Sequence, residues 1–267
     1  MEKSLIYVWH DCFVYVGTRC AVVFDYWRDG DGFYGDTVST DELVRAVAGR
    51  RVYVLVSHHH KDHFNRRVFG WASELPDVRY VISKDTARAV HYLLKEGSTY
   101  SGPLKVNPER VLVLREGEEY EDSLLRVSAF GSTDIGNSYV VEVDGLKLFH
   151  AGDLNAWMWK DESTAAEVQA AIRDFERKVE AIRARYPRLD YAMFPVDARI
   201  GRDWWEGAWR FVRMVDVGCF IPMHFSLFEN EEERLRYMRC ATTFSLYANP
   251  SRGAYASMSV PGERLLL

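Results

Sequence analysis

The sequence predicts an α/β protein in which two β-sheets pack face to face and helices cover the outside. Three observations support this prediction. Strand-like runs fall into two groups along the chain, helical segments alternate with the strands in each group, and polar residues follow the ends of several strands. The 267 residues are 48% hydrophobic and 27% charged, as in soluble globular proteins. Because no low-complexity linker interrupts them, we expect one domain over residues 1–267.

The first group of elements is rich in β-branched and aromatic residues, which favour extended structure. Its predicted strands are residues 5–9, 13–16, 21–24, 51–56 and 80–82. Its predicted helices are a short one with Thr40 as N-cap, residues 65–73, and residues 85–95 with Gly97 as the C-terminal cap. Loops are expected over residues 29–32 and 98–108, which are rich in residues that favour turns.

The second group begins near residue 111. Its predicted strands are residues 111–114, 124–129, 139–143, 147–149, 189–194, 219–222 and 254–260. Asp144 and Gly145 predict a tight hairpin between two of these strands. The predicted helices are residues 164–185, 204–215 and 231–240, the last with Asn230 as N-cap. In the longest helix, apolar residues recur at intervals of three and four and so share one face. They are Val168, Ile172, Phe175, Val179, Ile182 and Tyr186.

Composition excludes several classes of protein. The net charge of −5 and the pI near 5.9 disfavour a broad contact with nucleic acid. No apolar run reaches the length of about 18–20 residues that a membrane span needs. The N-terminus lacks the pattern of a signal peptide, and the four cysteines form no Cys-x-x-Cys pair. We therefore expect a cytoplasmic protein with reduced cysteines, no membrane contact and no nucleic-acid partner, and the oligomeric state is left open.

A cluster of histidines follows the apolar strand over residues 51–56. Four of the eight histidines lie between His58 and His63. Alternate residues of an extended segment point the same way, so His58, His60 and Asp62 can converge, and His63 can join them as the chain turns. Imidazole and carboxylate groups together suit Zn²⁺, Mn²⁺ or Fe²⁺. The less favoured alternative is a solvated, histidine-rich loop.

The pattern His-x-His-x-Asp-His over residues 58–63 resembles the signature of the metallo-β-lactamase-fold hydrolases. Three later elements of that family follow in order, each at a strand end. They are Asp134 where the family usually has histidine, Asp153 in His-Ala-Gly-Asp, and His224 in Ile-Pro-Met-His. The resemblance extends from Leu5 to about His224. The opening strands and the last motif look most like the branch containing ascorbate-phosphate lactonase-like proteins. The resemblance implies a four-layered αβ/βα sandwich with a metal site at one edge, between the sheets.

The resemblance also implies two divalent metal ions (Zn, Mn or Fe) and their ligands. One ion would bind His58, His60 and Asp134, and the other would bind Asp62, His63 and His224, with Asp153 as the bridge. The aspartate at position 134 departs from the family pattern and shifts the preference toward Mn²⁺ or Fe²⁺ without excluding Zn²⁺. Asp134 could instead stabilise a turn or orient His58 or His60.

These implied ligands lead to an expected function. A metal-activated water would attack a small ester, lactone or phosphodiester, and Asp62 is the residue expected to orient that water or accept its proton. Di-iron redox relatives of this fold usually carry glutamate at the position of His60, so hydrolysis is the favoured chemistry. The alternative from another class is a non-catalytic metal- or ligand-binding protein of the same fold, which the departure at Asp134 supports.

Four further residues are expected near the site. Asp197 is placed to hydrogen-bond a ligand histidine, and Arg199 to contact an anionic small-molecule substrate. The alternative for both is an ion pair that fixes the loop. His10 is expected in the wall of the pocket and His150 beside the metals, and the alternative for each is ordinary burial.

Overall fold

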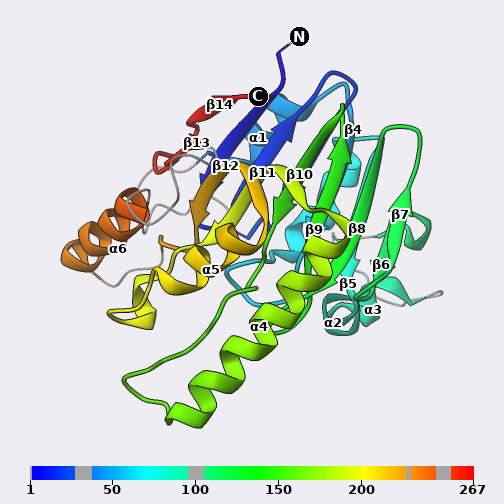
Figure 1. Cartoon of the computed structure of the whole chain (residues 1–267). Coiled ribbons are helices and arrows are strands. Elements are labelled where there is room, and N and C mark those ends of the chain that lie inside the picture. Colours follow the sequence, from blue (N-terminus) through cyan, green and yellow to red (C-terminus); the bar gives the residue numbers. More distant parts are fainter. Residues whose placement is uncertain (1, 28–37, 96–103, 105, 227–229, 245–253) are drawn as a thin grey trace.

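Two β-sheets lie face to face, with helices on both outer faces (Figure 1). The computed structural model describes residues 2–27, 38–95, 104, 106–226, 230–244 and 254–267. Within these residues each sheet has seven strands, and both sheets mix parallel and antiparallel pairs. The predicted four-layered αβ/βα sandwich is confirmed.

The first sheet contains the N-terminal strands and one strand from the end of the chain. In spatial order they are β14 (Arg264–Leu266), β1 (Ser4–Trp9), β2 (Cys12–Val16), β3 (Cys20–Phe24), β4 (Arg51–Val56), β5 (Val78–Ser83) and β6 (Val111–Leu114). Pairing is antiparallel from β14 to β3 and parallel from β3 to β6. Because β14 pairs with β1, the two ends of the chain lie close together (Figure 1).

The second sheet repeats the pairing pattern of the first. Its strands, in spatial order, are β13 (Ala254–Tyr255), β12 (Asp216–Met223), β11 (Arg188–Pro195), β10 (Leu146–His150), β9 (Asn137–Val143), β8 (Leu125–Gly131) and β7 (Glu119–Glu121). Pairing is parallel from β13 to β10 and antiparallel from β10 to β7. The predicted hairpin joins β9 to β10, and both Asp144 and Gly145 have positive φ, as a type I′ turn requires.

Helices complete the two outer layers. Those beside the first sheet are α1 (Thr40–Val47), η1 (Arg66–Ser73), α2 (Lys84–Ala89) and α3 (His91–Leu94). Those beside the second sheet are α4 (Ala165–Arg185), α5 (Glu206–Met214) and α6 (Glu231–Thr243). Two short 3₁₀ turns, η2 (Pro108–Arg110) and η3 (Ala198–Ile200), lie in connections. No helix in the described ranges combines the length and the apolar character needed to cross a bilayer.

The period of two along the strands separates two hydrophobic cores. In β1, Leu5 and Tyr7 belong to the core between the sheets, whereas Ile6 and Val8 belong to the core under α1. These strands are covered on both faces, so their sequences are continuous apolar runs. The apolar face predicted for α4 is confirmed, because all of its residues are buried.

Several element boundaries differ from the predictions. Ser39 rather than Thr40 is the N-cap of α1, because its hydroxyl accepts the Glu42 N–H and the Glu42 side chain accepts the Ser39 N–H. The helix predicted over residues 85–95 is two short helices, since Val90 leaves the helical conformation. The helix predicted over residues 65–73 is the 3₁₀ helix η1.

The shortest strands were the hardest to predict. β7 and β14 have three residues each and were not predicted. The strand predicted over residues 254–260 is limited to β13. Gly97 and the loops predicted at residues 29–32 and 98–103 lie outside the described residues.

Candidate metal centre

The candidate metal centre lies at the edge of the sandwich where strand ends of both sheets meet. From the first sheet, residues 58–63 follow β4, and His10 and Asp11 lie in the turn between β1 and β2. From the second sheet, Asp153 follows β10 and His224 follows β12. The parallel strands of each sheet direct their carboxyl ends to this edge, so residues distant in the sequence meet there.

Two glycines allow the loops around Ser57 to approach closely. Gly136 has a φ of 75°, and a Cβ there would lie 2.1 Å from the Ser57 carbonyl oxygen. Gly152 has a φ of 53°, and a Cβ there would lie 2.8 Å from the Ser57 Cβ. Asn137 N–H donates to the same carbonyl at 3.0 Å. Only glycine fits at these two positions, because it adopts a positive φ readily and has no Cβ to clash with Ser57.

Four buried residues form what we call the inner cluster: Asp11, His63, Asp153 and His224. Asp153 Oδ1 lies 2.9 Å from His63 Nε2 and 3.2 Å from His224 Nε2. Asp11 Oδ2 lies 3.2 Å from His63 Nε2 and 3.8 Å from His224 Nε2. Each carboxylate therefore faces both ring nitrogens.

A second group, the outer cluster, consists of His58, His60, Asp134 and again Asp153. His58 Nε2 lies 3.4 Å from Asp153 Oδ2 and 3.0 Å from His60 Nδ1. His60 Nδ1 lies 3.5 Å from Asp134 Oδ2, and these two side chains are 45% and 41% exposed. Asp153 thus turns one oxygen to each cluster, and the outer cluster is open to solvent where the inner cluster is not.

Asp62 lies beside the inner cluster rather than within it. Its Oδ2 is 3.9 Å from His10 Nε2 and 4.0 Å from His63 Nε2, and the side chain is 25% exposed. It groups with His10 and His224. The structure therefore brings together the side chains of His58, His60, Asp134, Asp153, His63 and His224, with Asp62 beside them, and it adds Asp11 to the inner cluster. Which of them bind metal stays a prediction.

The hydrogen bonds of the outward-facing nitrogens determine which histidines present a lone pair to the clusters. His63 Nδ1 lies 2.8 Å from Asp25 Oδ2, and His224 Nδ1 lies 2.8 Å from Asp197 Oδ2. An ionised carboxylate only accepts hydrogen bonds, so each Nδ1 carries a proton. In its neutral form each of these histidines therefore directs an Nε2 lone pair into the inner cluster, as a metal ligand must.

His58 follows the same rule through a hydroxyl. Ser57 Oγ donates its hydrogen to Asp25 Oδ2 at 2.5 Å and so accepts from His58 Nδ1 at 2.9 Å. The His58 Nε2 lone pair then faces the outer cluster. One buried carboxylate, Asp25, thereby fixes the orientation of His58 and His63 together.

His10 and His150 have the opposite tautomer, with the proton on Nε2. His10 Nδ1 accepts the Ser226 N–H at 3.2 Å, and His150 Nδ1 accepts the Gly152 N–H at 3.2 Å. Their Nε2 atoms therefore carry the protons, and that of His150 donates to the Asp11 carbonyl at 2.8 Å. Neither ring offers a lone pair to a metal. His10 lines the site and His150 supports the loop that carries Asp11.

The charges of the inner cluster depend on one another. Burial raises the pKa of Asp11 to about 7. Burial would also raise the pKa of Asp153, but the charges of His63 and His224 outweigh it and hold the pKa well below its usual range. Burial opposes the charged form of His224, yet Asp11 and Asp153 raise its pKa to about 10. Positive charge between the two carboxylates is therefore strongly favoured.

The atoms that face one another in the inner cluster fit a metal ion. Among the described residues, five of these buried atoms make no hydrogen bond: Asp11 Oδ1, Asp11 Oδ2, His63 Nε2, Asp153 Oδ1 and His224 Nε2. Buried polar atoms are nearly always hydrogen-bonded, so this concentration needs an explanation. Imidazole and carboxylate groups are the usual ligands of Zn²⁺, Mn²⁺ and Fe²⁺, and a divalent ion would satisfy one such atom from each of the four residues.

Asp197 and Arg199 lie on the far side of His224, where they were expected. Arg199 donates to both oxygens of Asp197, with Nη2 at 2.6 Å from Oδ2, while Asp197 accepts from His224. Burial opposes ionisation of Asp197, but the bonds from His224 and Arg199 outweigh it and lower its pKa. The ion pair thus fixes the loop and also orients a histidine of the inner cluster.

Three residues of the site were missed from sequence: Asp11, Asp25 and Ser57. Asp25 and Ser57 directly follow strands, and Asp11 lies in the two-residue turn between β1 and β2; this position is the only signal that the sequence offers for them. Asp25 also has a φ of 43°, a backbone conformation that is uncommon for a residue other than glycine.

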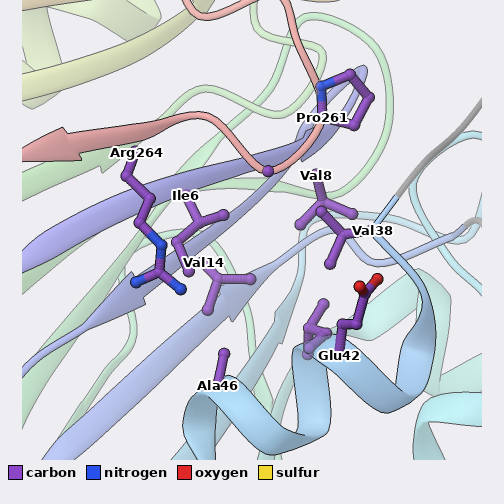
Figure 2. A pocket seen from close by; sticks show the side chains of 10 residues that line it. Ile6, Val8, Val14, Val38, Glu42, Ala46, Pro261 and Arg264 are labelled. Atoms are coloured by element: carbon purple, nitrogen blue, oxygen red, sulfur yellow. The ribbon is translucent and has the colours of Figure 1, made fainter.

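A separate cavity of about 320 Å³ lies on the face of the first sheet that is turned away from the second sheet, between the first sheet and α1. Figure 2 shows apolar side chains of β1 and β2 facing α1, with Pro261 and Arg264 beside them. None of its lining residues belongs to either cluster. The cavity is therefore distinct from the candidate metal centre.

Residues 4–169 match the family model described as the beta-lactamase superfamily domain, which is more than half of the chain. A UPF0173 metal-dependent hydrolase of Pyrococcus furiosus is 25% identical over 178 residues, which are 65% of this chain and 66% of the relative.

Solved structures share the fold at low sequence identity. Igni18, a metallo hydrolase from the archaeon Ignicoccus hospitalis, superposes with a TM-score of 0.62 at 12% identity, covering 100% of this chain and 99% of that one. CmlA, a diiron β-hydroxylase from Streptomyces venezuelae, gives a TM-score of 0.66 at 13% identity, covering 100% of this chain and 54% of that one. YhfI, a metallo-β-lactamase fold protein from Bacillus subtilis, gives 0.58 at 9% identity, with 99% of each chain covered.

The fold, the buried cluster of histidines and aspartates, and the family match agree with one another. The chain belongs to the metallo-β-lactamase superfamily of metal-dependent hydrolases.

Proposed function

We propose that this chain hydrolyses a small anionic ester, lactone or phosphodiester with the help of two divalent metal ions. The observation that carries the proposal is the position of Asp153 between the two clusters. Its Oδ1 faces His63 and His224, and its Oδ2 faces His58. A carboxylate shared by two metal ions needs this arrangement. Zn²⁺, Mn²⁺ and Fe²⁺ all suit the ligands, and the carboxylates favour the last two.

The residues around the clusters supply the other parts of the chemistry. A bound divalent metal ion lowers the pKa of water from 15.7 toward about 7 and stabilises the oxygen that gains charge. Asp62, at the partly exposed edge of the inner cluster, accepts the proton of the attacking water. The buried His10 Nε2 lies 3.9 Å from Asp62 Oδ2, so this ring forms the wall beside that carboxylate. Asp25 and Asp197 keep His63 and His224 in the orientation that binds metal.

Arg199 supports an anionic substrate. Its Nε and Nη2 atoms are engaged by Asp197, while its Nη1 makes no hydrogen bond to the described residues. The side chain is 37% exposed, so it can bind a phosphate or carboxylate that approaches the site. Because the net charge is −5, a small anion is favoured over a polyanion such as nucleic acid.

Within the superfamily, we propose a place near the ascorbate-phosphate lactonase-like branch. The support is the sequence of the opening strands and the Ile-Pro-Met-His segment that ends at His224. A cytoplasmic enzyme without a nucleic-acid partner remains our prediction.

The experiment begins with metal content, measured by mass spectrometry on untagged protein purified without chelator. Two ions per chain support the dinuclear site, and one ion indicates a mononuclear site. Hydrolysis of bis(p-nitrophenyl) phosphate and of a simple lactone is then measured with added Mn²⁺ or Zn²⁺. Asp62→Asn is expected to lower the rate about 10²–10⁴-fold.

The matched control is Asp77→Asn, which removes a carboxylate that pairs with Arg51 on the surface, away from the site. Its rate should equal that of wild type. Equal rates for wild type and Asp62→Asn would leave a non-catalytic metal-binding protein as the better explanation. One observation favours this non-catalytic alternative. The side chains of His60 and Asp134 are exposed, and an outer cluster with such exposed ligands would bind a second ion weakly.

A further inference from the structure

We infer that Asp11 is a metal ligand, and that it completes the inner metal position in place of Asp62. The inference rests on the proposed function and deepens it, because it adds a ligand that lies outside the sequence motifs of the family. The ligand comes from the turn between β1 and β2, at the start of the chain.

The main chain around Asp11 is anchored from both sheets. The Asp11 carbonyl oxygen accepts a hydrogen bond from His150 Nε2 of β10 at 2.8 Å. The His10 N–H donates to the Tyr7 hydroxyl at 2.9 Å, and the pairing of β1 with β2 shifts register beside this turn. His10 has a φ of 57°, a backbone conformation that is uncommon for a residue other than glycine. A ligand held this way is positioned before any metal binds.

No hydrogen bond among the described residues compensates for the burial of the Asp11 side chain. It is fully buried, and neither of its oxygens accepts a hydrogen bond from the described residues. An unsatisfied buried carboxylate is among the most costly groups in a folded protein. Asp25, which is equally buried, accepts three hydrogen bonds and shows what a carboxylate with a purely structural role looks like.

Three ring nitrogens surround Asp11 Oδ2, at 3.2 Å in His63, 3.3 Å in His10 and 3.8 Å in His224. His63 and His224 direct Nε2 lone pairs toward it, as their outer hydrogen bonds require. Lone pairs and a carboxylate repel one another unless a cation lies between them. A cation there would contact two nitrogens and one oxygen each from Asp11 and Asp153, a set of four ligands that suits a divalent transition metal.

The alternative is that His63 and His224 are protonated and that Asp11 is only their counter-ion. Protonated rings would donate Nε2–H hydrogen bonds to the carboxylates. Neither Nε2 atom makes a hydrogen bond of acceptable geometry, although both lie within 4 Å of two carboxylates. The arrangement of these atoms therefore favours a shared cation.

The test compares Mn²⁺ binding by wild type, Asp11→Asn and Asp62→Asn, followed by electron paramagnetic resonance of free Mn²⁺. Asp11→Asn is expected to weaken the tighter Mn²⁺ site at least 10–100-fold, whereas Asp62→Asn should change it less than threefold. Co²⁺ absorption gives a second readout, because loss of a ligand alters the visible spectrum. Near-UV circular dichroism shows whether the variant is folded, and Asp11→Ser replaces Asp11→Asn if it is not.

Each outcome decides the inference. Weaker binding in Asp11→Asn with unchanged binding in Asp62→Asn supports it. Mn²⁺ affinity within threefold of wild type and an unchanged Co²⁺ spectrum in Asp11→Asn overturn it and leave the proposed function intact. A larger loss in Asp62→Asn than in Asp11→Asn also overturns it, since Asp62 would then be the ligand. If wild type binds no Mn²⁺, Zn²⁺ or Co²⁺, the proposed function fails as well.

Discussion

Replacing Asp25 by asparagine is expected to weaken metal binding although Asp25 belongs to neither cluster. Asp25 Oδ1 accepts the Ser57 backbone N–H at 2.7 Å, and Oδ2 accepts Ser57 Oγ–H and His63 Nδ1–H. A backbone N–H can only donate, so in Asp25→Asn the amide oxygen must take the position of Oδ1. The NH₂ group then faces two groups that previously donated to Oδ2.

The consequence is a change of tautomer in His63. Its Nδ1 must accept from the new NH₂ group, so the proton moves to Nε2, which lies 2.9 Å from Asp153 Oδ1. The lone pair that faced the inner cluster is lost. Removing the outer partner of a ligand histidine typically lowers metal affinity 10–100-fold, or about 1.4–2.7 kcal/mol at 1.36 kcal/mol per tenfold change. We expect the upper end, because Asp25 also orients His58 through Ser57.

Titration with Mn²⁺ gives the affinity, and ¹⁵N NMR of the histidine rings gives the tautomer. The matched control is Asp122→Asn, which alters a carboxylate that accepts hydrogen bonds from Tyr53 and Tyr120 and lies outside the site. Its Mn²⁺ affinity should equal that of wild type. The reasoning is refuted if Asp25→Asn binds Mn²⁺ within threefold of wild type, or if His63 keeps its proton on Nδ1.

Four further outcomes are expected. Burial opposes ionisation of Asp122, but hydrogen bonds led by that from Tyr53 lower its pKa to about 2, so Asp122→Asn should cost about 1–2 kcal/mol of unfolding free energy at pH 7. This stabilisation is present above about pH 4 and is lost as the pH falls toward 2, and a constant difference across urea titrations in that range would contradict it. Gly136→Ala should cost at least about 2 kcal/mol, because the new Cβ meets the Ser57 carbonyl, and an unchanged melting temperature would disprove the clash. Phe175→Ala should lower the free energy of unfolding by about 3–5 kcal/mol in chemical denaturation, because this ring of α4 is fully buried. It should leave Mn²⁺ affinity intact, because Phe175 belongs to neither cluster. A loss below 1 kcal/mol would show that the helix packs loosely. A chelator should lower the melting temperature, and Mn²⁺ restored to 100 times its Kd should return about 2.7 kcal/mol, whereas no shift would count against a metal site.

The part of the site that follows a local pattern could be predicted from the sequence. Alternation along an extended segment grouped His58 with His60, and their ring nitrogens lie 3.0 Å apart. It also grouped Asp62 with them, whereas Asp62 lies beside the inner cluster. Asp153 and His224 were found through the resemblance to the metallo-β-lactamase family, because each ends one of its motifs after an apolar strand. Whether these residues bind metal stays a prediction.

Asp11 and Asp25 could not be predicted in the same way. Each is a single acidic residue at a strand end, and nothing nearby in the sequence separates such a residue from an ordinary turn. Asp25 meets His63, which is 38 residues away, and Asp11 meets His150, which is 139 residues away. Their roles depend on which strand ends become neighbours, and that is a property of the whole fold.

The same contrast applies to the elements of the fold. Helix α4 has five buried apolar positions on one face, and Tyr186 at its C-cap continues the pattern, so its periodicity was sufficient to predict it. Strand β14 has three residues, and its extended conformation depends on pairing with β1, which comes from the other end of the chain. A segment of that length carries too little local preference to be recognised alone.

The division of the inner cluster between the sheets has a mechanical consequence. Asp11 and His63 belong to the half of the molecule built on the first sheet, and Asp153 and His224 belong to the half built on the second. A cation held by all four would act as a cross-link between the two halves, and neither half alone offers more than two of these ligands. Metal uptake would then be a late step of folding, possible only after the sheets have docked. During refolding, the rate at which the protein captures metal would measure the rate at which its two halves come together.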